Sequence, residues 1–572
     1  MRLNTPTLTP VDFVSRWLHA DWSERASYQE HFRSVCQLVG APTPSEYGVP
    51  EDYTFEYGLK KTNGAQGYGD VFRRGHFAFE YKQKGKDLDK AYQQLQQYRE
   101  NMNNPPLLVV CDIDHWEIHT NFTNTPTIVE RFRNEDLLKP RYQQIVRRVF
   151  SDPESFHPDK NKLDITAEVA ATFRSVVDDA LAYNNDPEQV ARFLTKLVFC
   201  LFVEDIGLLP KREYDGILTF IIREAKKNRD SREVFRRYVA ELFAAMATGG
   251  NVLMADIPYF NGSMFEGDGS EIVPLGGVAL NALDRASDQN WAHVEPSIFG
   301  TIFERTLDQK KRAQLGAHYT HPDDIRLIVE PVLMQPLRRE WTTIQIEAAP
   351  IHQRYEQAAN AAQKVAAEKE LRALRARMLE RVRTITVLDP ACGSGNFLYI
   401  ALRLLLDLEK EIITHPLLAM LPEETIGVRP TQLYGIERNE IAHALASVVV
   451  WIGYLQWRHE NGYHERNEPI LDSMRENIVQ MDAILAYDAE GKPIEPEWAA
   501  VDVIVGNPPF LGGNRVRAEL GNKYVEDLFR LYAGRLGATW YGSRAGWLAA
   551  ALVAWDALVV TYAKQPMSDV PA

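Results

Sequence analysis

Cysteine is scarce in this chain, with four residues among 572, and none of them forms a CxxC pair. The four positions, Cys36, Cys111, Cys200 and Cys392, are widely separated. This scatter argues against a disulfide framework and against a structural zinc site. A reducing cytoplasm is therefore the simplest compartment for the chain.

Long apolar runs are also missing. Residues 1–6 lack the apolar segment of a secretory signal peptide, so we expect none. The stretch 547–562 is apolar, but it is only about 16 residues long and contains Asp556, whereas a membrane span needs roughly 20 residues. We expect a buried helix there and no membrane partner.

The chain also has no excess of positive charge, because 64 Lys and Arg stand against 78 Asp and Glu, a net charge of -14. Binding to phosphates depends on local Lys and Arg and not on the total. The acidic balance therefore makes a nucleic-acid partner only modestly less expected. At 572 residues the chain is too long for one hydrophobic core and predicts three or four domains.

A glycine-rich turn stands out in the second half of the chain. The apolar, strand-like residues 385–388 lead into residues 389–397, which read DPACGSGNF, and a helix is predicted from about residue 396. Small residues in such a turn let the backbone approach a ligand at the carboxyl end of a strand. On its own, this turn is weak evidence, since it could serve a nucleotide or no ligand at all.

Two acidic residues follow at the ends of further strand-like segments. Glu437 ends the segment 433–437 and can accept both hydroxyls of a ribose, while Asp482 in the segment 477–483 can accept an adenine amine. Either acid alone is better explained as a cap or a surface charge. Their order after the glycine turn favours a cofactor site in a doubly wound parallel sheet.

The residues GNPPF at 506–510 follow the apolar strand 501–505. Hydrogen bonds from an exocyclic amine to the Asn507 side-chain oxygen and the Pro508 carbonyl would favour a pyramidal nitrogen with a free lone pair. Such catalysis needs positioning and electrostatics but no covalent intermediate. Phe510 would stack on a base that has left the duplex.

Together these segments resemble the S-adenosylmethionine (SAM) dependent adenine-N6 DNA methyltransferases in which the cofactor motif precedes the catalytic one. The resemblance also assigns the segment 316–322, where His321 between Thr320 and Pro322 departs from the usual pattern. Cys392 is interpreted as a small buried residue. The catalytic residues implied are Asn507, Pro508, Pro509 and Phe510, and the cofactor-binding residues are Ala317, Tyr319, Thr320, Asp389, Ala391, Gly393, Gly395, Asn396, Phe397, Glu437 and Asp482.

A second chemical motif lies near the N-terminus, where Asp70 is followed after nine residues by Glu80-x-Lys82. Two strands joined by a turn would bring Asp70 and Glu80 together, and period-2 alternation directs Glu80 and Lys82 to one face. The two carboxylates suit Mg²⁺, and Lys82 can position the attacking water. A solvated hairpin explains this spacing equally well, but the aromatic strand and the Gln-rich helix that follows resemble the PD-(D/E)xK nucleases.

The complete order resembles the single-chain type IIG restriction-modification enzymes, and especially the IIL group. This implies an α/β fold with a Rossmann-like methyltransferase domain, a PD-(D/E)xK nuclease-like domain and a helical connector. The boundaries expected are 1–155 for the nuclease-like domain, 156–290 for the connector, 291–535 for the methyltransferase domain with a helical insertion at 340–384, and 536–572 for a divergent tail.

In that group a target-recognition domain follows the methyltransferase domain, and residues 536–572 do not resemble it. Two interpretations stay open: a truncated product, which we favour, or a chain that uses a separate recognition subunit. The leading hypothesis is a restriction-modification enzyme that methylates adenine N6 in double-stranded DNA and carries a Mg²⁺-dependent endonuclease. The alternatives are a methyltransferase with a silent, DNA-binding nuclease fold, an inactive remnant that binds SAM or DNA, and, as the least favoured, a methyltransferase acting on proteins or small molecules.

Overall fold

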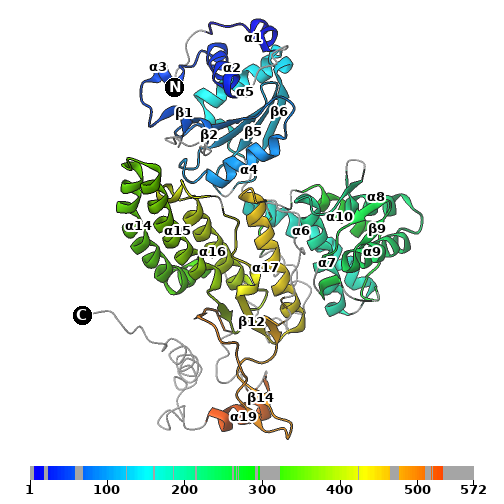
Figure 1. The fold of residues 1–572 in the computed structure, drawn as a ribbon. Coiled ribbons are helices and arrows are strands. Elements are labelled where there is room, and N and C mark those ends of the chain that lie inside the picture. The colour runs from blue at the N-terminus through cyan, green and yellow to red at the C-terminus, as the bar shows by residue number, and fades with distance from the viewer. Residues whose placement is uncertain are drawn as a thin grey trace.

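A computed structural model of the chain defines the fold (Figure 1). The described residues are 6–17, 24–57, 69–123, 125–158, 162–184, 186–212, 215–260, 263–265, 267, 269–289, 291, 294–296, 322–422, 424–463, 474, 476–508, 517 and 520–532. Among them, no helix combines the length and apolar character needed to cross a bilayer. The predicted helix at 547–562 lies outside the described residues.

A mixed sheet organises the N-terminal region. In the described part it has six strands in the order β1-β2-β3-β4-β5-β6, and all neighbours are antiparallel except β3 and β4. The parallel pair is joined by the crossover helix α4. The elements are α1 (Pro10–Trp17), α2 (Glu24–Val39), α3 (Pro44–Tyr47), β1 (Tyr53–Tyr57), β2 (Gly69–Arg73), β3 (Phe77–Tyr81), α4 (Leu88–Tyr98), β4 (Leu107–Cys111), β5 (His115–Thr120), β6 (Val129–Arg133) and α5 (Pro140–Ser151).

The alternation of side chains along β3 determines what lies on each face of this sheet. Phe77, Phe79 and Tyr81 are buried in one core with residues of α1, α2 and α5. Ala78 belongs to a second, smaller core with α4. Because successive side chains of a strand point to opposite faces, Glu80 lies on the α4 side of the sheet.

Helices dominate the connector. The helix α7 is apolar on nearly all sides and is buried, as its sequence predicts. The buried carboxylate of Glu204, at its end, accepts hydrogen bonds from the backbone N–H groups of Leu218 (2.7 Å) and Thr219 (3.3 Å) in the first turn of α8. The elements are α6 (Lys162–Tyr183), α7 (Pro187–Asp205), β7 (Lys211–Arg212), β8 (Asp215–Gly216), α8 (Ile217–Lys227), α9 (Ser231–Thr248), β9 (Gly250–Val252), β10 (Ala255–Ile257) and α10 (Gly277–Ser287).

A parallel sheet follows, and its described strands lie in the order β13-β12-β11-β16. The order reverses between β11 and β16, which makes their carboxyl ends a topological switch point, where open α/β sheets bind ligands. The elements are α13 (Pro322–Val329), a π-helix (Glu330–Met334), α14 (Gln335–Glu356), α15 (Ala361–Thr384), β11 (Val387–Asp389), α16 (Asn396–Thr414), β12 (Leu433–Glu437), α17 (Glu440–Glu460), β13 (Ile478–Gln480), β14 (Ala486–Tyr487), β15 (Pro493–Ile494), β16 (Val503–Ile504) and α19 (Asn522–Tyr532).

The predicted insertion at 340–384 is a helical hairpin made of α14 and α15. One hydrophobic cluster runs from the connector through α16 and α17 to β16. Glycine permits a close contact between α16 and α17, because a Cβ on Gly453 would overlap the ring of Tyr399. The connector and the parallel sheet therefore share a core, whereas the N-terminal sheet has cores of its own.

Substituting Gly453→Ala should destabilise the chain by about 1–3 kcal/mol, because the added methyl group overpacks the contact with Tyr399. Thermal unfolding of the full chain measures this as a lower midpoint. Gly277→Ala is the matched control, because a Cβ at this helical position meets no atom within 4 Å and should be neutral or stabilising. An unchanged midpoint for Gly453→Ala would contradict the packing described.

Candidate functional site

The glycine-rich turn lies directly beyond β11, where the sequence predicts it. The backbone N–H of Gly395 donates to the carbonyl of Cys392 (2.8 Å), and the N–H of Cys392 donates to the carbonyl of Ile436 at the end of β12 (3.0 Å). Gly393 and Gly395 both have positive φ, at 53° and 83°, which glycine adopts without strain. Space beside Gly393 is open, since a Cβ there would meet nothing within 4 Å.

Asp389 begins this turn and is buried, with 1% of its surface exposed. Its Oδ1 accepts the N–H of Ala391 at 3.0 Å. Its Oδ2 and the Oδ1 of Asn396 have no hydrogen-bond partner among the described residues. Burial raises the pKa of the Asp389 carboxyl to about 7, and the charge of Glu437 adds to this shift.

Glu437 fastens the end of β12 to the glycine turn. Its carboxylate accepts the N–H of Gly393 at 2.9 Å and the N–H of Asn439 at 2.7 Å. Burial raises the pKa of this carboxyl as well. Each carboxylate oxygen has two lone pairs, so the side chain keeps the capacity to accept further hydrogen bonds from a ligand.

Asp482 follows β13 and is held on both sides. Its Oδ1 accepts the N–H groups of Ile484 (3.0 Å) and Leu485 (3.2 Å), and its Oδ2 accepts the hydroxyl of Tyr524 (2.8 Å). Burial, together with the charge of Asp482, raises the pKa of the Tyr524 hydroxyl. The sequence gives no signal for Tyr524, because α19 meets this acid only through the fold.

The segment after β16 reaches the glycine turn. A Cβ on Gly506 would overlap an oxygen of the Asp389 carboxylate, so only glycine fits between β16 and Asp389. Asn507 comes next and is exposed, and Pro508 is half-buried. Of the other predicted residues, Pro509, Phe510, Ala317, Tyr319 and Thr320 lie outside the described residues.

The N-terminal motif is assembled by the hairpin of β2 and β3. The register pairs Val71 with Phe79, so its continuation sets Asp70 opposite Glu80. The Oδ2 of Asp70 accepts the N–H of Tyr81 at 2.7 Å. Lys82 Nζ lies 2.7 Å from Glu80 Oε1, which confirms that these two side chains share a face.

Gln94 on α4 is a further member of this group. Its Oε1 accepts a hydrogen bond from Lys82 Nζ at 3.3 Å. The sequence shows a Gln-rich helix but not which glutamine reaches the motif. Within the described residues, no group of three or more His, Cys, Asp or Glu side chains could hold a metal ion, so Asp70 and Glu80 stand as a pair of carboxylates.

Comparison with known families identifies three matching domain descriptions. Residues 8–181 match the MmeI N-terminal domain, residues 188–265 the MmeI helicase spacer domain, and residues 359–552 the MmeI DNA-methyltransferase domain. The three matches follow one another along the chain. They cover the region of the hairpin motif, the connector and the parallel sheet.

Two curated relatives resemble the chain. DNA methyltransferase A of Bacillus subtilis is 25% identical over 509 residues, which is 87% of this chain and 53% of the relative. A Methanocaldococcus jannaschii protein, provisionally named a type II restriction enzyme and methyltransferase, is 24% identical over 61% of this chain and 32% of its own length. The chain therefore spans about half the length of one relative and a third of the other.

Among solved structures, the type IIL restriction-modification enzyme MmeI in complex with DNA matches with a TM-score of 0.46 and 22% identity. That match covers 64% of this chain and 46% of the solved chain. A DrdV–DNA complex matches with a TM-score of 0.30 and 14% identity, over 96% of this chain and 48% of the other.

The raised pKa of Asp389 predicts a pH-dependent stability. With a pKa of about 7 when folded and about 3.9 when unfolded, the folded chain binds a proton that the unfolded chain releases between these values. Stability therefore falls as pH rises through this window, by about 1.4 kcal/mol for each unit of the pKa shift.

The variant Asp389→Asn removes this titration, so its stability relative to wild type should be higher at pH 8 than at pH 5. Denaturant unfolding of the full chain at both pH values measures the difference. Glu380→Gln, at an exposed position of α15, is the control. A difference between Asp389→Asn and wild type that is the same at both pH values would contradict the assigned burial.

Proposed function

The chain belongs to the MmeI-type family of restriction-modification enzymes, and from this premise we propose that it methylates adenine N6 in double-stranded DNA with SAM and carries a Mg²⁺-dependent endonuclease. In this proposal residues 1–155 form the nuclease domain, 156–290 the connector and 291–535 the methyltransferase domain. Because the chain spans about half of its relatives, these activities are proposed for the residues present here. The names of the relatives, which include a DNA methyltransferase and a type II restriction enzyme, support both halves.

The contact between Gly506 and Asp389 carries the methyltransferase half of the proposal. It brings the residue before Asn507 against the acid that begins the glycine turn. Methyl transfer requires the donor and the acceptor nitrogen to meet in line at close range. The switch point between β11 and β16 offers a place where the methyl donor and the acceptor nitrogen can lie close together, beside the backbone at Gly506.

The residues of the turn suit the proposed cofactor. Asp389 Oδ2 and Asn396 Oδ1 are buried acceptors without a partner among the described residues, and Gly393 leaves open space beside the backbone. Asp389, Glu437 and Asp482 contribute acidic groups that favour a cationic ligand. When bound, SAM supplies an electrophilic methyl group on a sulfonium centre.

The proposed catalytic work of the chain is positioning. Asn507 Oδ1 and the Pro508 carbonyl accept hydrogen bonds from the exocyclic amine of a flipped adenine, and Phe510 stacks on the base. These acceptors would favour a pyramidal amine nitrogen, whose lone pair could accept the methyl group that bound SAM would supply, with the thioether as the leaving group. The amine then loses one proton to solvent, so the product is a neutral secondary amine.

Replacing Asn507 by Ala should lower methyl transfer to duplex DNA by about 100-fold or more, because one preorganised acceptor is lost. Cofactor binding should be unchanged. Transfer of tritiated methyl groups from labelled SAM measures the first, and calorimetry the second. Asn228→Ala, at an exposed position after α8, is the control; unchanged transfer in Asn507→Ala would contradict the role proposed for this side chain.

The hairpin motif supports the nuclease half. Asp70 and Glu80 offer hard oxygen ligands of the kind that Mg²⁺ prefers, and the remaining ligands would come from water and phosphate. Such a metal would stabilise charge on the scissile phosphate. Lys82, paired with Glu80 and Gln94, would hold the attacking water or neutralise the developing charge.

Substituting Lys82→Ala should abolish DNA cleavage in the presence of Mg²⁺ while methyl transfer stays at the wild-type level, because the two sites lie in different domains. Gel analysis of supercoiled plasmid and tritium transfer on the same preparation give the two readouts. Lys86→Ala, an exposed lysine in the loop that follows, is the matched control. If both activities fell in parallel in Lys82→Ala, the separation of the sites would be wrong.

A further inference from the structure

The helix α4 lies between the two proposed sites and contacts both domains (Figure 1). On one side, Gln94 Oε1 accepts a hydrogen bond from Lys82 Nζ. On the other, the Nε2 atoms of Gln96 and Gln97 donate to the carbonyls of Glu460 (3.0 Å) and Gly462 (3.1 Å) at the end of α17. A displacement of α4 would therefore move Gln94 and change the hydrogen bond that it accepts from Lys82.

Lys410, near the end of α16, is the centre of this contact, and only 3% of its surface is exposed. Its Nζ donates to the backbone carbonyl of Gln96 (2.9 Å) and to Asn461 Oδ1 (2.8 Å). It also forms an ion pair with Glu100 at 2.6 Å. The Lys410 ammonium therefore connects α16 with Gln96 of α4, with Glu100 just after α4, and with Asn461 just after α17.

The same face of α16 carries a row of polar side chains at helical spacing, which lie above one another on one side of a helix. Arg403 donates to the hydroxyl of Tyr399 (3.1 Å) and to Glu460 (2.8 Å), and Asp407 accepts from the Trp457 indole (2.6 Å). At the end of the row, Asn101 Nδ2 donates to the carbonyl of Thr414 (2.6 Å). The helix begins at Asn396 in the glycine turn, so it spans the distance from the proposed cofactor site to α4.

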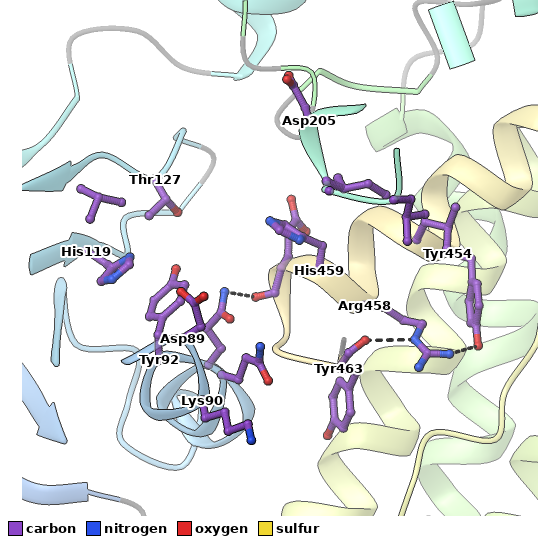
Figure 2. Close-up of a pocket in the computed structure, with 18 of the residues that line it drawn as sticks. Asp89, Lys90, Tyr92, His119, Thr127, Asp205, Tyr454, Arg458, His459 and Tyr463 are labelled. Carbon is purple, nitrogen blue, oxygen red and sulfur yellow. Dashed lines mark hydrogen bonds between the residues drawn. The ribbon is translucent and has the colours of Figure 1, made fainter. Parts of the chain in front are cut away.

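Beside this contact lies an open cavity of about 1390 Å³, lined by all three regions of the chain. Figure 2 shows Tyr92 and His119 on the N-terminal side, and Tyr454, Arg458 and His459 on the side of α17. The N-terminal and methyltransferase domains are therefore separated by this cavity next to the contact around Lys410. The polar bonds of that contact consequently contribute much to fixing the position of α4.

We propose that Lys410 of the methyltransferase domain is a positioning residue for the nuclease site, because it seats α4 so that Gln94 holds Lys82 beside Glu80. This inference rests on the proposed function for its catalytic consequence. Its structural consequence, the restraint on Lys82, exists whether or not the chain cleaves DNA. A backbone contact supports the same seating independently, because a Cβ on Gly462 would overlap the backbone of Gln93 in α4.

The test uses the full chain and the variants Lys410→Met, Gln94→Leu and their combination. Lys369→Met, an exposed lysine of α15, is the matched control. Competitive acetylation with acetic anhydride, read out by mass spectrometry, reports how freely the Lys82 amine reacts. Plasmid cleavage with Mg²⁺ and tritium transfer from SAM are measured on the same preparations.

In Lys410→Met we expect the acetylation of Lys82 to rise severalfold and cleavage to fall roughly 10- to 100-fold, as misplacement of a catalytic group does. Methyl transfer should stay at the wild-type level. Gln94→Leu should show the same changes, and the double variant should be no worse than either single one. A loss caused merely by a less stable fold would instead add to that of Gln94→Leu.

Unchanged acetylation of Lys82 in Lys410→Met overturns the inference, and so does an additive double variant or a parallel loss of methyl transfer. Gly462→Ala provides a second route, because it disturbs the seat of α4 without altering Lys410 and should also raise acetylation of Lys82. If the wild-type chain does not cleave DNA but acetylation of Lys82 still rises in Lys410→Met, the nuclease half of the proposed function fails and the positioning role stands.

Discussion

The close approach of Gly506 to the Asp389 carboxylate is the contact on which the parallel-sheet site depends. It can form only because residue 506 has no side chain, and it joins the ends of two strands that are far apart in sequence. The same carboxylate also accepts the N–H of Ala391 and so shapes the glycine turn. One buried acid therefore organises both the proposed cofactor cradle and the approach to Asn507.

The two proposed sites handle negative charge in different ways. Around the glycine turn, burial raises the pKa values of Asp389 and Glu437 and so disfavours their charged forms, which a cationic ligand would favour again. In the hairpin site, Glu80 already has the ammonium of Lys82 at 2.7 Å. The first arrangement suits a positively charged cofactor. The second suits a site where carboxylates bind a cation and the lysine neutralises charge on a phosphate.

Much of this architecture follows from local patterns. Alternation over residues 77–82 predicts both the strand and the common face of Glu80 and Lys82, and the small residues of 389–395 predict the turn between β11 and α16. The edge strands β1 and β6 were not predicted from their composition. Tyr524 and Lys410 owe their roles to contacts between elements distant in sequence, and the role of Gln94 depends on how α4 packs beside β3; periodicity contains no information about such contacts.

The division of the hydrophobic cores explains why the polar contact around Lys410 can determine how the N-terminal domain is oriented on the rest of the chain. The connector and the parallel sheet are continuous with each other, but the N-terminal sheet has separate cores. Domains that do not share a core are expected to move relative to one another unless their interface is large and apolar. Here the contact at α4 is made by directional hydrogen bonds and a buried ammonium. Such bonds define one orientation sharply, because each is lost after a small displacement. Because α4 also contributes Gln94 to the hairpin site, these bonds would fix the position of that site relative to the rest of the chain.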